Sequence, residues 1–190
     1  MRKSFHEKGF SLVETLVAVS LLTIAITAPM ALASKSLTSA YYARDQITAF
    51  YLAQEAIEAV RAVRDGQILQ IAQSANATGF NIFGPIPQNA AFMVDARKSG
   101  SEVIVIPLCD GGLAPTYGCL PLQTDGNLYG YGIGTNTAFT RAVQARLVDA
   151  ANSNEIRVTV TVSWKSGTIQ RSFTISEDMY RWIEDGVSQQ

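Results

Sequence analysis

Residues 9–14, Gly-Phe-Ser-Leu-Val-Glu, lie at the boundary between a short basic leader and a long apolar segment. The leader, residues 1–9, carries three basic side chains. Residues 10–33 are 24 residues with a single charge, that of Glu14. As an α-helix this segment would be about 36 Å long, which is enough to cross a hydrocarbon layer of ~30 Å. The sequence therefore predicts a membrane-spanning helix, and because a carboxylate in lipid is costly, Glu14 is expected to have a partner.

Residues 8–18, Lys-Gly-Phe-Ser-Leu-Val-Glu-Thr-Leu-Val-Ala, resemble the N-terminus of the type IV prepilins, a family that includes the pseudopilins of type II secretion and of competence systems. The resemblance implies that prepilin peptidase cleaves between Gly9 and Phe10 and methylates the new N-terminus at Phe10. It also implies that Glu14 is the membrane glutamate of the family and acts in assembly. The basic leader would stay in the cytoplasm, which places the C-terminal part of the chain outside.

The spacing of Phe10 and Glu14 suggests how assembly could work. Glu14 lies four residues after Phe10, so we expect the two side chains to share a helical face one turn apart. We expect the Glu14 carboxylate to pair with the Phe10 amine of a neighbouring subunit and so to fix the axial register. Alternatively, Glu14 extends toward the lipid headgroups from near the end of the helix. A second alternative is an uncleaved signal anchor in which Gly9 is incidental, but it leaves Glu14 unexplained.

Residues 34–65 are predicted to continue the helix as an amphipathic segment. They contain neither Pro nor Gly and are rich in helix-favouring residues. Glu58 and Arg61 are spaced for a contact on the helix surface, and Asp65 with Gly66 is expected to end the helix. The polar face of this segment includes Glu55 and Arg64. The apolar face consists of Leu52, Ala56, Ala59, Val60 and Val63.

Residues 66–190 are predicted to form one globular, β-rich head domain. Apolar and polar residues alternate over residues 139–147, 156–164 and 169–175, which is the pattern of half-buried antiparallel strands. We expect turns at residues 152–154 and 165–167 and a short strand within residues 102–108. Residues 66–91 and 109–134 are predicted to be loops, and residues 177–186 a short helix or a continuation of the last strand. The predicted fold class is α+β: a long N-terminal helix packed on a C-terminal antiparallel sheet, as in pilins.

Cys109 and Cys119 are the only cysteines, and Gly and Pro are frequent between them. In an oxidising exterior, an even pair across a flexible loop predicts a disulfide. The alternatives are two free thiols or half of a metal site, and no histidine lies nearby to complete such a site.

Catalytic chemistry is sparse in this chain. The only histidine, His6, lies in the leader, so cleavage would remove the histidine that nucleophile pairs and zinc sites commonly use. Asp110, Asp125 and Asn127 could supply oxygen atoms to calcium, but their spacing matches no EF-hand. We therefore predict no catalytic residue, no metal and no cofactor. A formal net charge of −1, without a basic run interleaved with aromatic residues, argues against nucleic acid as a partner.

The sequence thus predicts a structural subunit rather than an enzyme, namely a minor type IV pilin or a pseudopilin. It would sit in the bacterial cytoplasmic membrane as a single-pass protein with its head outside, and then enter a pilus or pseudopilus. The implied partners are prepilin peptidase, other pilin or pseudopilin subunits, the membrane assembly platform, and the lipid bilayer before assembly. The alternative is a membrane-anchored extracellular binding module that forms no filament. Its binding surface would be the loop between the cysteines with three nearby tyrosines, Tyr117, Tyr129 and Tyr131.

Overall fold

The structure is a computed structural model that describes residues 9–74, 81–105, 109–149, 152–181 and 183. It confirms the α+β fold class, since one long helix precedes an antiparallel sheet. The chain divides between Arg44 and Asp45 into two compact units, and the helix runs through both. The elements are α1 (Leu12–Gln73), β1 (Ala91–Val94), the 3-10 helix η1 (Gly100–Val103), β2 (Ile104–Val105), β3 (Pro121–Thr124), β4 (Tyr129–Gly130), β5 (Thr135–Asp149), β6 (Asn152–Ser166) and β7 (Ile169–Tyr180).

Helix α1 is longer at its C-terminal end than predicted. The expected end at residues 65–66 is wrong, because α1 continues through Gly66 to Gln73. Glycine inside a helix costs about 1 kcal/mol relative to alanine, but the residues that follow are helix formers, and Ile71 among them is buried. Pro29 likewise lies inside α1 without ending it.

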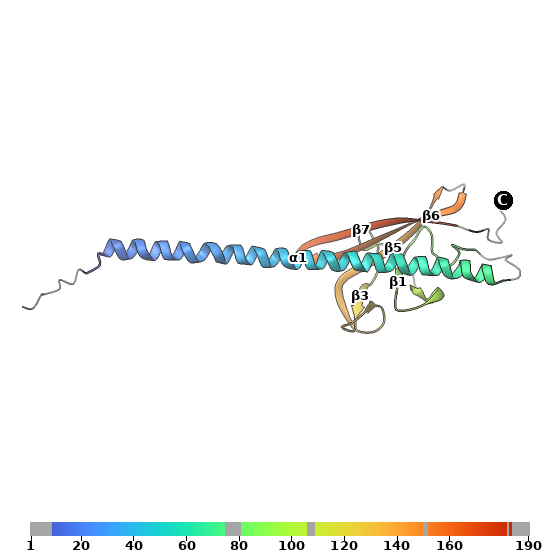
Figure 1. The fold of residues 1–190 in the computed structure, drawn as a ribbon, viewed down its shortest axis with the longest axis horizontal. Coiled ribbons are helices and arrows are strands. Elements are labelled where there is room, and N and C mark those ends of the chain that lie inside the picture. Colours follow the sequence, from blue (N-terminus) through green and yellow to red (C-terminus); the bar gives the residue numbers. More distant parts are fainter. Residues whose placement is uncertain (1–8, 75–80, 106–108, 150–151, 182, 184–190) are drawn as a thin grey trace, which may run out of the picture. The chain divides into compact units, whose positions relative to one another are not determined.

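Strands β5, β6 and β7 form the main part of the sheet, and in the second unit they lie beside the part of α1 that follows Asp45 (Figure 1). All three were predicted by their alternating pattern. β5 pairs with β6 along one edge, and along its other edge it pairs with β1 near Val143 and with β3 near Asn136. β2 and β4 extend these two branches by pairing with β1 and β3.

Several local predictions need correction. Residues 152–154 are strand and not turn, because Asn152 already pairs with Asp149. In residues 102–108 the chain forms the end of η1 and the two-residue strand β2, and residues 106–108 lie outside the described part. Residues 177–180 continue β7, whereas the predicted loop at 109–134 contains β3 and β4. The predicted loop at 66–91 begins instead with the last turns of α1.

The core of the second unit lies between α1 and the inner face of the sheet. Nine residues of α1 between Ala49 and Arg64 are buried there, and Arg64 is among them, although the periodicity predicted that it faces away. The sheet contributes mainly alternate positions of β5 and β6, as expected for strands with one buried face; they include Phe139, Arg141, Val143, Ala145, Ile156, Val158, Val160, Val162 and Trp164.

Candidate processing and assembly site

The helix begins at Leu12 because the side chain of Ser11 caps it. The Ser11 hydroxyl accepts a hydrogen bond from the Glu14 backbone N–H at 3.2 Å, and the Ser11 carbonyl accepts the first intrahelical bond, from Thr15 N–H at 3.1 Å. A serine at the N-cap satisfies one of the N–H groups that the first turn leaves without a partner. Gly9 and Phe10 therefore precede the helix.

This start overturns one prediction. Phe10 and Glu14 do not share a helical face in the unprocessed chain, because Phe10 lies outside the helix. The peptide bond between Gly9 and Phe10 is likewise outside the helical hydrogen-bond pattern, and both residues are exposed. The candidate cleavage position thus has an open, non-helical backbone.

All five hydroxyl groups of residues 10–33 are hydrogen-bonded within the chain. Ser11 accepts from a backbone N–H, as described above, and the other four donate to backbone carbonyls three or four residues earlier. These bonds are Thr15 to Leu12 O at 2.9 Å, Ser20 to Val17 O at 2.8 Å, Thr23 to Val19 O at 2.6 Å and Thr27 to Thr23 O at 2.9 Å. Since lipid offers no partners to polar groups, this arrangement suits the helix to a hydrocarbon environment.

Glu14 is the exception in this segment. Its side chain is exposed, and within the described residues its carboxylate makes no hydrogen bond or ion pair. The surrounding side chains are apolar and exposed as well, and α1 is long and apolar enough, by length and composition, to cross a membrane. Glu14 is therefore the single polar side chain of residues 10–33 that still needs a partner.

The head domain contains a buried ionic cluster that sequence reasoning missed. Arg141 on β5 is fully buried and donates hydrogen bonds to Leu52 O at 2.9 Å, to Val94 O at 2.6 Å and to Glu55 Oε2 at 2.6 Å. One side chain thus joins α1, β1 and β5. The available signal was its position, because Arg141 occupies an inward place in the alternation of residues 139–147.

A second ion pair lies beside it. Asp95 is 1% exposed and accepts two hydrogen bonds from the Arg97 guanidinium, at 2.9 and 2.8 Å, and one from Tyr131 N–H at 3.2 Å. Burial acts to raise the pKa of the Asp95 carboxyl, but these hydrogen bonds outweigh it and the pKa is lowered. Gly130 provides the space for this arrangement, since a Cβ there would lie 2.1 Å from Arg97 Nε. The carboxylates of Glu55 and Asp95 are each bonded to a guanidinium group, that of Arg141 and that of Arg97. These two ion pairs therefore hold elements of the head together rather than exchange protons.

Cys109 and Cys119 form a disulfide, with their Cα atoms 4.5 Å apart. The loop that it closes packs on the outer face of the sheet, where a small core consists of Ala91, Met93, Cys119 and Ala142. Cys109 N–H donates to Ala91 O at 3.1 Å, which attaches the loop to β1.

The three tyrosines near this loop differ in their surroundings. Tyr131 packs against the small core, and burial raises the pKa of its hydroxyl. Tyr129 makes an edge contact with Phe139, with 6.5 Å between ring centroids. Tyr117 also packs against the small core but lines a groove on the surface. Within the described residues no group of three or more His, Cys, Asp or Glu side chains is placed to hold a metal ion.

Residues 4–28 match the family model of the prokaryotic N-terminal methylation motif. The match includes Gly9, Phe10 and Glu14 and most of the apolar segment, and it supports processing of the prepilin type. Neither a curated protein nor a solved structure matches this chain.

Proposed function

We propose that this chain is a minor type IV pilin or a pseudopilin, a structural subunit without enzymatic activity. Prepilin peptidase removes residues 1–9 and methylates the amine of Phe10. The processed subunit waits in the cytoplasmic membrane with its head outside, and a membrane assembly platform brings it together with other subunits into a pilus or pseudopilus. The observation that carries the proposal is the N-terminal methylation motif at residues 4–28.

The geometry of the N-terminus supports the processing step. A peptidase needs access to the backbone on both sides of the bond that it cleaves, and Gly9 and Phe10 are exposed and precede the capped helix. After cleavage Phe10 carries a new amine, two residues before the start of α1.

The distribution of polar side chains in residues 10–33 supports the assembly step. Since the hydroxyl groups of residues 10–33 are already hydrogen-bonded, Glu14 is the one side chain that gains a directed interaction when two subunits pack. A carboxylate in apolar surroundings is stabilised when a cation neutralises it, and the Phe10 amine of a neighbouring subunit is such a cation. Packing of apolar side chains then holds the helices together, and the charge pair sets their axial offset.

The first experiment is intact mass measurement and N-terminal sequencing of the protein isolated from a native membrane that contains the peptidase. A chain that begins with N-methylated Phe10 is the expected result. A chain that begins at Met1 would overturn the proposal, and the membrane-anchored binding module would take its place. Gly9→Val should block cleavage, whereas Gly66→Ala, a glycine change far along α1, should leave it intact.

The second experiment tests Glu14 in assembly. Glu14→Ala should be processed like the wild type but should be lost from isolated filaments, because no carboxylate remains to pair with the neighbouring amine. Glu102→Ala removes an exposed carboxylate of the head and should enter filaments normally. Normal incorporation of Glu14→Ala would show that the charge pair is not needed.

A further inference from the structure

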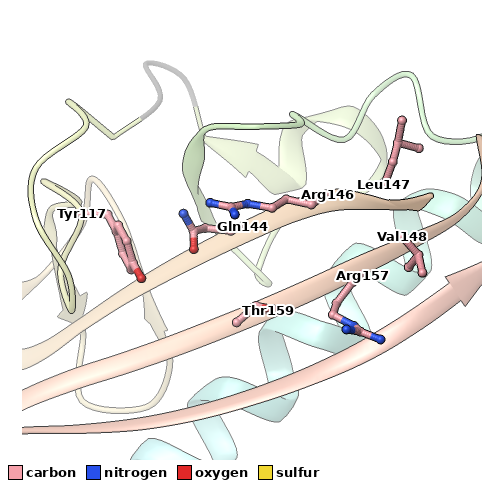
Figure 2. A pocket seen from close by; sticks show the side chains of 7 residues that line it. All are labelled: Tyr117, Gln144, Arg146, Leu147, Val148, Arg157 and Thr159. Atoms are coloured by element: carbon pink, nitrogen blue, oxygen red, sulfur yellow. The ribbon is translucent and has the colours of Figure 1, made fainter. Parts of the chain in front are cut away.

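A groove of about 450 Å³ lies on the outer face of the sheet, the face opposite to α1. Five polar or aromatic residues line it together with two aliphatic ones, and Figure 2 shows them (Tyr117, Gln144, Arg146, Arg157 and Thr159). Gln144 and Arg146 alternate along β5 with Val143 and Ala145, which are buried on the inner face. We call this surface the Arg146 groove.

The floor of the Arg146 groove contains two arginines at opposite positions of neighbouring strands. In the register of β5 and β6, Arg146 faces Arg157, and Gln144 faces Thr159. Like charges directly opposite across two strands destabilise a sheet, so this pair has a cost. Asp178 compensates only Arg157, with two hydrogen bonds at 2.7 and 2.8 Å.

No carboxylate of the described residues pairs with Arg146. It is exposed, and it makes no ion pair within the part of the chain that the structure describes. Figure 2 shows its guanidinium extended along β5 toward Gln144 and the side of the groove where Tyr117 lies, whereas Arg157 points away toward β7. The groove therefore holds one uncompensated cation beside an amide and a hydroxyl group.

Tyr117 forms the wall of the groove, and its loop holds it in place. The disulfide closes the loop, and Tyr117 N–H donates to Leu113 O at 2.9 Å. Tyr117 has φ +52°, and the next residue, Gly118, has φ +75° with Asp110 Oδ1 occupying the place of a Cβ. A glycine is needed at such a position, so the loop is tightly specified. In Figure 2 the ring stands beside the floor with its hydroxyl directed toward it.

We propose that the Arg146 groove binds a carboxylate-bearing sugar residue, such as a uronic acid unit of an acidic glycan. A guanidinium matches a carboxylate with two parallel hydrogen bonds. Gln144 offers donors and an acceptor for sugar hydroxyl groups, and the Thr159 hydroxyl, already bonded to the Ser176 hydroxyl at 2.9 Å, keeps a further acceptor position. The ring of Tyr117 offers an apolar surface for a face of the sugar ring. The proposal concerns the head domain and does not rest on the proposed assembly into a filament.

The charge of the groove favours this ligand over a nucleic acid. A nucleic acid presents a regular row of phosphates and is bound by several cations. The described lining supplies one uncompensated guanidinium, and the whole chain has a formal net charge of −1. One carboxylate among hydroxyl groups is the better match.

The test is isothermal titration calorimetry with the full chain in detergent micelles. The probes are trigalacturonic acid and the matched neutral galactose trisaccharide. The acidic trisaccharide should bind and the neutral one should bind at least about tenfold more weakly, because charge-assisted hydrogen bonds are roughly twice as strong as neutral ones. Arg146→Gln should weaken binding of the acidic probe to the level of the neutral one, and Tyr117→Phe should retain binding whereas Tyr117→Ala should not.

Lys165→Gln is the matched control, since it removes an exposed cation from β6 outside the groove. It should leave the affinity unchanged. Equal affinity for the two trisaccharides, an unchanged affinity of Arg146→Gln, or tighter binding of a single-stranded DNA oligonucleotide that depends on Arg146 would each overturn the proposal. Because Arg146 is exposed, its replacement should not unfold the protein, and circular dichroism of the variant checks this.

Discussion

At the scale of single residues, two arginines on neighbouring strands show how much burial changes the role of the same side chain. Arg141 is fully buried and bonded to two carbonyls and a carboxylate, whereas the side chain of Arg157 is 55% exposed and pairs with Asp178 on the surface. A buried ion pair that loses one partner leaves an uncompensated charge, and an exposed pair contributes little to stability.

We expect Arg141→Met to lower the free energy of unfolding by about 2–3 kcal/mol, because it removes three hydrogen bonds and leaves Glu55 unpaired against the sheet. Arg157→Met should cause a far smaller loss. Chemical denaturation followed by circular dichroism measures both. Equal losses for the two variants would contradict the role assigned to Arg141.

Asp95 should make stability depend on acidic pH. Its pKa is lowered in the folded state, since the hydrogen bonds from Arg97 and Tyr131 outweigh the effect of burial. The unfolded chain therefore binds a proton at higher pH than the folded one, and stability must fall as the pH drops below about 4 through the folded-state pKa. Denaturation at pH 3 and pH 6 should show this fall, and Asp95→Asn should reduce the difference between the two. An unchanged difference in Asp95→Asn would assign the dependence to other carboxyls, such as Asp178, whose pKa is also lowered by its bond with an arginine.

At the scale of secondary-structure elements, the start of α1 depends on one hydroxyl. Ser11→Ala should weaken the first turn by about 1 kcal/mol, because the Glu14 N–H loses its acceptor. Hydrogen exchange of the Glu14 amide in micelles should become faster. Ser20→Ala is the matched control, since its hydroxyl donates to a carbonyl within the helix and leaves no N–H unpaired. Equal acceleration in both variants would contradict the capping role of Ser11.

The elements that could be predicted are those whose signal is local. The alternation in residues 139–147 and 156–164 has the period of a strand with one buried face, so β5 and β6 were predictable. β3 and β4 have two to four residues in a glycine-rich region and show no periodicity. Helix α1 continues past Gly66, and Ile71 in this extension is buried. Burial is a tertiary effect, so the local residues that normally signal the end of a helix could not predict the extension.

The candidate sites also differ in whether a local sequence signal could predict them. Gly9, Phe10 and Glu14 stand close together in the sequence, so a local motif was enough to select them. The lining of the Arg146 groove comes from the disulfide loop, β5 and β6, and the register that places Arg146 opposite Arg157 depends on strand pairing. Arg141 is a similar case, since its partners on α1 and β1 are distant in the sequence.

At the scale of the whole molecule, the division between Arg44 and Asp45 predicts that the second unit folds alone. Among the described residues the buried core begins at Ala49, so residues before Asp45 contribute no buried side chain to it. A chain that begins at Asp45 should be soluble without detergent, form the Cys109–Cys119 disulfide and unfold at the same denaturant concentration as the head of the full chain. Circular dichroism during denaturation and mass measurement of the disulfide test this. An unfolded or aggregated product would show that the head needs the first unit.

Four hydroxyl groups of α1, those of Thr15, Ser20, Thr23 and Thr27, already donate to backbone carbonyls, and this has a mechanical consequence. Because none of them must find a new partner when lipid is replaced by protein, the surroundings of the helix can change without breaking a hydrogen bond. A neighbouring helix could slide along this surface or turn against it with only the small energy steps of apolar packing. The carboxylate of Glu14 would distinguish one axial position from the others. In the proposed assembly, such a subunit would leave a bilayer smoothly and still stop at a fixed step along a growing fibre.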